Sequence, residues 1–168
     1  TGGHRSHPPK ATKILEQKIN IQERRKAIRS AIAATINKEL VIQRGHKIPE
    51  GYPFVVDSSF EQLGKTKELF SAMEKLGFRE DLQRSAPKNV RAGKGKRRGR
   101  KYQRKKGPLI VVGGDCPLLH SARNVPGIDV VKASALNASM LAPGTHPGRL
   151  TLWTDAAVKA IAEKKMFM

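Results

Sequence analysis

The apolar positions of the chain follow two periods and predict alternating helices and short strands. Ile21, Ile28 and Ile32 recur at helical spacing with small alanine residues between them, which indicates an amphipathic helix over 21–36. Asn20 stands immediately before this pattern and has the side-chain oxygen that caps a helix N-terminus. We therefore expect the first helix to begin after Asn20.

A second helical pattern covers 66–76, where Leu69, Phe70 and Met73 share one face and Gly77 provides the stop. It follows a short apolar run that is typical of a buried strand, so the two elements outline the start of a βαβ unit. Short apolar runs predict strands at four places: 54–56, 109–112, 128–131 and 150–153.

The remaining helices are expected after the later strands. Asp115 is expected to cap a short helix that ends near residue 124, and Thr154 to cap a last helix that runs through residue 161. Strands and helices that alternate at such short intervals predict an α/β fold, a three-layer α/β/α sandwich with a mostly parallel sheet.

The 168 residues suffice for one domain with a hydrophobic core. Their net charge is +19, and the run at 88–106 alone holds eleven Lys or Arg and no Asp or Glu. Subtracting these eleven charges leaves +8 on the rest of the chain. Such a field favours a nucleic acid or an anionic membrane surface as partner. Because the run contains neither a long apolar span nor an amphipathic helix, nucleic acid is the better prediction.

The composition of the basic run indicates how it would bind. Its only ring is Tyr102, whereas proteins that stack single-stranded bases use several rings. Interspersed glycines and arginines instead suit close approach to the phosphates of a folded RNA. The alternatives are a solubilising or localisation patch, and DNA binding, for which no helix-turn-helix or zinc-finger signature is present. The basic residues of the run are Lys88, Arg91, Lys94, Lys96, Arg97, Arg98, Arg100, Lys101, Arg104, Lys105 and Lys106.

Two further basic groups are candidates for RNA contact. On the 21–36 helix, Arg24, Arg25 and Arg29 fall mostly off the apolar face, where they either meet RNA or form an ordinary solvated surface. The first ten residues are rich in Gly, Pro and His, and they predict an extended segment that carries Arg5 and Lys10. On composition alone, this segment is as readily a frayed terminus.

One short stretch of the sequence could support catalysis. Residues 113–116, Gly-Gly-Asp-Cys, follow a strand and precede a helix, where N–H groups can bind an anion, and Cys116 and His120 could act as thiolate and base. A small α/β enzyme or anion-binding domain that uses this 113–120 turn is therefore the alternative function. The spacing fits no Walker loop or dinucleotide fingerprint, and the five histidines show no metal-ligand spacing. The single cysteine excludes an internal disulfide and fits a reducing cytosolic setting.

Five stretches are distinctive, and they follow one another along nearly the whole chain: GGHRSHPPK, ERRKAIRSAIAAT, RGRKYQRKKGPL, SARNVPGIDVV and LAPGTHPGRLTLWT. In this order they resemble the archaeal and eukaryotic-type branch of the large-subunit ribosomal protein four family. The resemblance implies an α/β sandwich that binds large-subunit ribosomal RNA beside neighbouring large-subunit ribosomal proteins and supports assembly and translation. It also implies a cytoplasmic location in the ribosome, without catalysis, cofactor, metal, membrane or small-molecule substrate.

The same resemblance assigns boundaries and residues. Residues 1–12 would be the base of an extended RNA-binding loop, and 13–168 a single globular domain with the basic connection at 88–106. The family's first strand, most of its tunnel-reaching loop and the eukaryotic C-terminal extension have no counterpart here, so we expect the natural protein to extend beyond Thr1. RNA contact is implied for Arg5, His7, Arg97, Arg98, Arg100, Lys101, Tyr102, Arg104, Arg123, Asn124 and Arg149.

Overall fold

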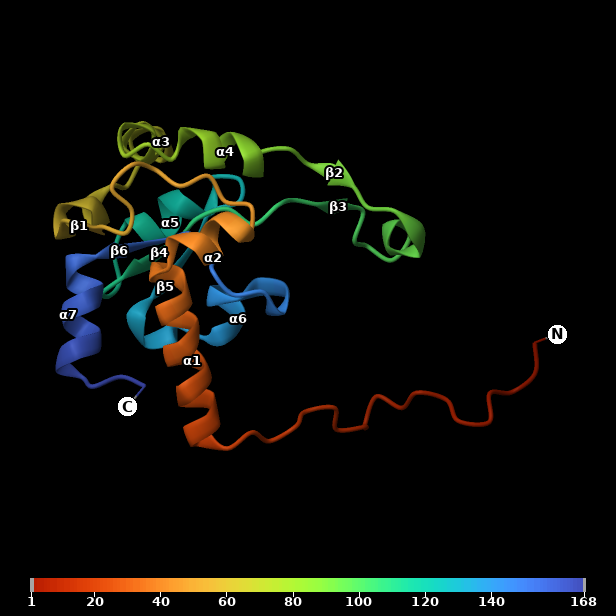
Figure 1. The fold of residues 1–168 in the computed structure, drawn as a ribbon. Coiled ribbons are helices and arrows are strands. Elements are labelled where there is room, and N and C mark those ends of the chain that lie inside the picture. The colour runs from red at the N-terminus through yellow and green to blue at the C-terminus, as the bar shows by residue number, and fades with distance from the viewer. Residues whose placement is uncertain (1, 168) are drawn as a thin grey trace.

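Four short parallel strands form the central sheet of the computed structural model, which describes residues 2–167 (Figure 1). The terminal residues of the two predicted domain ranges, Thr1 and Met168, lie outside the described residues. The strand order is β1-β6-β4-β5, and every neighbouring pair is parallel. The strands are β1 (Val55–Val56), β4 (Leu109–Val112), β5 (Asp129–Lys132) and β6 (Thr151–Thr154).

Both faces of the sheet are covered. The strand β4 is apolar throughout and all four of its residues are buried, as expected of a strand that is packed on both sides. The helices are α1 (Ile21–Ile36), α2 (Lys38–Gln43), α3 (Thr66–Lys75), α4 (Arg79–Ser85), α5 (Leu118–Arg123), α6 (Ala138–Leu141) and α7 (Asp155–Glu163). Ile110 and Val112 pack in one hydrophobic cluster with residues of α3, α4 and α5, whereas Leu109 and Val111 pack in a second cluster with residues of α1, α6 and α7.

The predicted α/β fold with a parallel sheet is confirmed, and its local details differ in three ways. First, β1 pairs with β6, so the expected βαβ unit does not place β1 beside β4. Second, α2 and α4 were not predicted. Third, Asp115 does not cap α5, whose N-cap is Pro117; the carboxylate of Asp115 instead pairs with Lys132 of the neighbouring strand β5.

The predicted caps of the first and last helices are present. The Asn20 side chain accepts a hydrogen bond from the Gln22 N–H, and Thr154 accepts one from the Ala157 N–H. The apolar face of α1 is shorter than its pattern suggested, because Ile21 and Ile36 are exposed and burial is confined to the middle of the helix.

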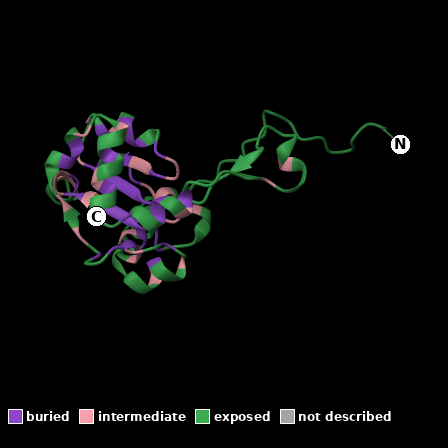
Figure 2. Cartoon of the chain, turned by 90° about the horizontal axis from the view of Figure 1, so that it is seen from above, coloured by how far each residue is buried: buried purple, intermediate pink, exposed green. Residues whose placement is uncertain are grey.

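Two segments project from the globular body in the same direction, and they are separated from each other (Figure 1). Residues 2–20 are extended and exposed, and the first helix of the body begins at Ile21. The basic run forms the second projection, a β-hairpin whose strands β2 (Asn89–Val90) and β3 (Tyr102–Gln103) pair in antiparallel fashion. We call residues 88–106 the arm. Figure 2 shows that the arm is almost entirely exposed.

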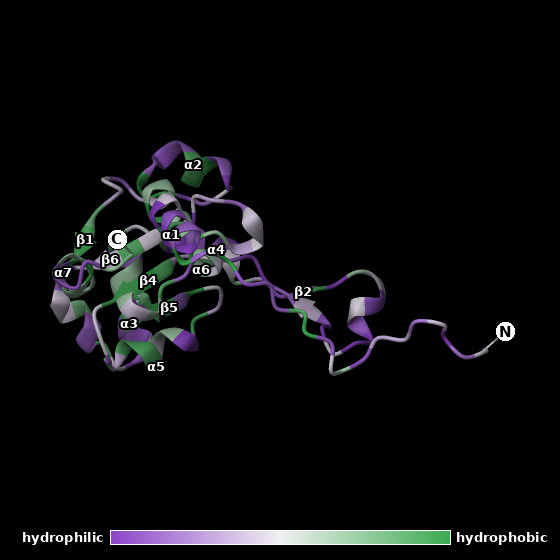
Figure 3. Ribbon diagram, turned by 90° about the horizontal axis from the view of Figure 1, so that it is seen from below, coloured by the Kyte–Doolittle hydropathy of each residue, from purple (hydrophilic) through white to green (hydrophobic). Residues whose placement is uncertain are grey.

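Within residues 2–167, no helix is long and apolar enough to cross a membrane. Figure 3 shows the apolar residues gathered in the sheet of the body, while the arm is largely hydrophilic.

Candidate nucleic-acid interface

The arm is a hairpin because its glycines permit a tight, crowded tip. Gly93 and Gly99 have φ values of 72° and 76°, a left-handed conformation that strains other residues. At Gly95 the reason is space, since a Cβ atom there would lie 2.7 Å from the side chain of Arg91. Arg91 is half-buried, and its Nε donates to the Arg100 carbonyl at 3.1 Å. Arg91 therefore braces the tip from within.

The other cations of the arm tip lie at its surface and have no carboxylate partner among the described residues. Lys94, Lys96, Arg97, Arg98 and Arg100 are all exposed. Across the described part of the chain, Lys106 is the only one of the eleven arm cations that forms an ion pair with a carboxylate. Charges held this close together without counter-charges create a strong positive potential, which attracts a polyanion.

The Tyr102 ring contacts two lysine side chains of the arm. The Lys88 Nζ lies 3.8 Å from the centroid of the Tyr102 ring, and the Lys101 Nζ lies 5.4 Å from it. These cation–π contacts occupy the ring and fix two of the arm's charges in position. The arm therefore presents closely spaced cations, and its single ring is in contact with two of them.

Arginines of the body hold the base of the arm by its backbone. The Arg84 Nη2 donates to the Lys106 carbonyl at 2.8 Å, and the Arg149 Nε donates to the Gly107 carbonyl at 3.0 Å. Asp129 adds one carboxylate, which accepts from the Lys106 Nζ at 2.9 Å and from the Arg149 Nη2 at 2.6 Å. Burial alone would raise the pKa of Asp129, but its hydrogen bonds with Lys106 and Arg149 hold that pKa below its ordinary value.

Arg149 is the predicted contact whose position the structure corrects. Its side chain is 1% exposed, and its third hydrogen bond goes to the Met140 carbonyl at 2.9 Å. Burial lowers the pKa of Arg149, although the Asp129 carboxylate opposes this shift. A guanidinium enclosed in this way cannot reach a phosphate, so Arg149 supports the base of the arm instead of touching RNA.

The other predicted residues are exposed but do not all converge. Arg123 and Asn124 end α5 and share a cavity of about 330 Å³ with Arg104, Lys105 and Lys106, so the structure joins them to the arm. The helix α1 carries a separate exposed group, and the extended N-terminal segment carries another (Figure 1). These two groups are Arg24, Arg25 and Arg29, and Arg5, His7 and Lys10.

Arg84 was missed by sequence reasoning. In the sequence it is one basic residue among many, and its contact with the arm spans 22 residues. The only local signal is its i, i+3 spacing from Asp81, whose Oδ1 accepts from the Arg84 Nε at 2.8 Å.

The turn at 113–120, the candidate catalytic or anion site, is a structural turn. The Gly113 N–H already donates to the buried Glu61 carboxylate at 2.9 Å, and the same oxygen accepts from Thr154 Oγ1 at 2.6 Å. A protein carboxylate therefore fills the position that an anion would take. Burial raises the pKa of Cys116, which disfavours a reactive thiolate. In residues 2–167, no three His, Cys, Asp or Glu side chains are placed to hold a metal.

Comparisons with known proteins bear on the whole chain. Residues 1–164 match the ribosomal protein L4/L1 family. The chain is 51% identical over 167 residues to the large ribosomal subunit protein uL4 of Methanocaldococcus jannaschii, which covers 97% of this chain and 66% of the relative. It is 52% identical over 158 residues to the protein of the same name from Methanococcoides burtonii, covering 94% of this chain and 62% of that relative. The chain thus spans just under two thirds of these relatives.

Proposed function

The chain belongs to the ribosomal protein L4/L1 family, and from this premise we propose that it is a structural constituent of the large ribosomal subunit that binds large-subunit ribosomal RNA. The relatives are named for that subunit. In this role the chain supports subunit assembly and translation on cytoplasmic ribosomes, contacts neighbouring large-subunit proteins, and needs no cofactor or small-molecule substrate.

One observation carries the proposal: ten of the arm's eleven cations have no carboxylate partner among the described residues. RNA phosphates would supply the missing counter-charges. Each neutralised phosphate releases condensed counterions, so affinity arises largely from this release and falls steeply with salt. Arginine adds geometry, because its planar fork can bridge two phosphate oxygens.

The shape of the arm supports recognition of a folded RNA rather than of a base sequence. A narrow exposed ribbon can enter a groove or a junction between helices, where phosphates approach from more than one side. The exposed cations on α1 and on residues 2–20 would provide separate contacts, which suits an RNA that surrounds the body. We propose residues 2–20 as the base of a second RNA-binding extension.

Competition between nucleic acids tests the proposal. Purified chain is bound to a labelled large-subunit ribosomal RNA fragment, and unlabelled ribosomal RNA or duplex DNA is added at one salt concentration. We expect ribosomal RNA to compete at much lower concentration than DNA, because the arrangement of cations matches one folded shape. Equal competition would contradict the proposal and leave only a non-specific basic surface.

A second measurement uses the particle. Chain added to large subunits depleted of it should co-sediment with them and stay bound as salt is raised towards molar concentration. Recovery only as free protein in low salt would refute a structural role in the subunit.

A further inference from the structure

A cavity of about 760 Å³ lies where the base of the arm meets the body. The end of α2, the helix α4, the returning strand of the arm and the loop before β6 surround it. The lining of the cavity carries positive charge and no carboxylate. Its basic or titratable residues are Arg44, His46, Arg84, Lys105, Lys106 and His146.

Arg44 lines this cavity and is held there by hydrogen bonds. Backbone carbonyls hold its guanidinium: the Nη2 donates to the Pro143 carbonyl at 2.6 Å, and the Nη1 donates to the Pro147 carbonyl at 3.4 Å. Across residues 2–167, Arg44 has no carboxylate within ion-pair distance. Burial lowers the pKa of Arg44, and the positive charges of Arg149 and Arg84 lower it further. The guanidinium is thus fixed in place among like charges.

The neighbouring cations have their carboxylates behind them, outside the cavity. Arg84 pairs with the buried Asp81, and Lys106 pairs with Asp129. Neither carboxylate lines the cavity, and Arg44 and Lys105 have no carboxylate partner in the described structure. Holding several cations together in a half-buried site is unfavourable, because burial and mutual repulsion both act against the charged groups. An anion that enters the site offsets this repulsion and stabilises it.

We propose that this cavity binds one phosphate of the RNA backbone together with its ribose. The cavity is much larger than a phosphate ion and lies within the range of pockets that hold small ligands, so it has room for one nucleotide unit. Arg44 provides a fixed positive charge and the guanidinium N–H groups that the Pro143 and Pro147 carbonyls leave free, and Lys105 and Lys106 approach from the arm. This inference rests on the proposed RNA binding and adds to it that the arm and the body share one phosphate.

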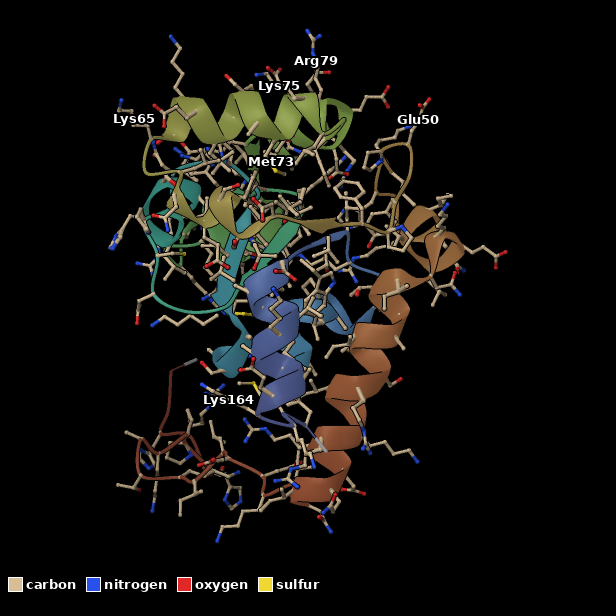
Figure 4. The ribbon with its side chains drawn as sticks, turned by 90° about the vertical axis from the view of Figure 1, so that its left-hand side faces the viewer. Glu50, Lys65, Met73, Lys75, Arg79 and Lys164 are labelled. Atoms are coloured by element: carbon tan, nitrogen blue, oxygen red, sulfur yellow. The ribbon has the colours of Figure 1, made fainter. Side chains whose placement is uncertain are left out.

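Arg44→Ala tests the inference in the whole chain, with Arg79→Ala as the matched control. Arg79 is an exposed arginine of α4 that points into solvent (Figure 4) and pairs loosely with Glu74 at 3.8 Å. We expect Arg44→Ala to weaken binding of the ribosomal RNA fragment about tenfold and to reduce the salt slope of binding by about 1, the value for one phosphate contact. Arg79→Ala should leave both unchanged. Equal effects of the two changes would overturn the inference.

A second measurement covers the case in which Arg44→Ala unfolds. Arg44→Lys keeps the charge and removes the fork, and it should bind RNA with intermediate affinity. Inorganic phosphate is then titrated into the wild-type chain at constant ionic strength while the backbone amide signals are followed by NMR. We expect shifts at Gly45 and Lys106, which line the cavity, and none at Gly114, beyond the opposite end of β4. Uniform shifts, or none, would overturn the site.

Failure of the site and failure of the proposed function have different signatures. If Arg44→Ala binds RNA as the wild type does while removal of arm charges weakens binding, the cavity is not a phosphate site and RNA binding stands. If the wild-type chain does not prefer ribosomal RNA at all, the proposed function fails, and the phosphate titration alone decides whether the cavity binds an anion.

Discussion

Replacing Arg97, Arg98 and Arg100 together with alanine should weaken RNA binding strongly and leave the fold intact. All three side chains are exposed at the arm tip, and none has a carboxylate partner among residues 2–167. Arg97 and Arg98 donate hydrogen bonds to the Lys94 and Gly95 carbonyls. The donors are their backbone N–H groups, which the change retains. The free energy of unfolding should therefore change by less than about 0.5 kcal/mol.

The expected loss of binding follows from the number of phosphates released. Each phosphate contact contributes about 0.7 to 0.9 to the slope of log K against log salt. Three lost contacts should reduce the slope by about 2 to 3, which corresponds to a roughly hundredfold loss of affinity at 0.15 M salt relative to 1 M, where the difference vanishes. Fluorescence anisotropy with a labelled ribosomal RNA fragment at four salt concentrations measures both quantities.

A control with the same change in net charge separates the arm from the general field. Lys65 lies just before α3, Lys75 at the end of α3 and Arg79 at the start of α4, and Figure 4 shows these three exposed side chains pointing into solvent along the α3 and α4 edge of the body. Their triple alanine variant should lower the slope by less than about 1. If the two triple variants lose affinity equally, the reasoning is refuted and only net charge matters. Loss of the circular dichroism signal in the arm variant would show that the arm is structural.

Three further results are expected. Cys116→Ser should bind RNA as the wild type does, and the Cys116 thiol should react slowly with a thiol reagent at pH 7, because burial raises its pKa; fast reaction would revive the catalytic alternative. Asp129→Asn should lower the free energy of unfolding, measured by urea titration, by about 2 to 3 kcal/mol, because it leaves the buried Arg149 without its ion-pair partner. This loss is smaller than that for a fully buried ion pair, because Asp129 is partly exposed and solvent screens the pair. Stability should be constant between about pH 7 and 8 and fall as pH drops below about 6.5, where the unfolded chain protonates His46 but burial in the folded state keeps its pKa lower. It should fall again below about pH 4, because burial alone would raise the pKa of Asp81 but its hydrogen bonds with His46 and Arg84 hold that pKa down when folded; a flat profile from pH 8 to 5 would contradict the assignment.

The elements that sequence reasoning found are those whose patterns are local. The run at 109–112 is apolar throughout, so a strand covered on both faces was the natural prediction, and all of its residues are buried. Likewise Thr154 precedes a helical pattern and caps α7, because a cap depends only on residues two or three positions away.

The hairpin in the arm left no readable pattern. Its strands have two residues each, Asn89–Val90 and Tyr102–Gln103, which is too short for an alternation of apolar and polar positions to appear. The eleven charges of the run also dominate any hydropathy average. Similarly, the pairing of β1 with β6 joins residues about a hundred positions apart, and nothing in either run specifies its partner.

The arm and the body are both basic and repel each other, and the buried Arg149 shows how they are nevertheless held together. Carboxylates would be the obvious anchors, but they would neutralise the charges that the proposed RNA contact requires. Instead, Arg84 and Arg149 bind the backbone carbonyls of Lys106 and Gly107, which leaves the arm's side-chain charges in place. A single carboxylate, Asp129, then compensates the buried guanidinium and one lysine at the root of the arm. Because these anchors act on the backbone, the position of the arm and the charge it displays are set by different residues and can be altered separately.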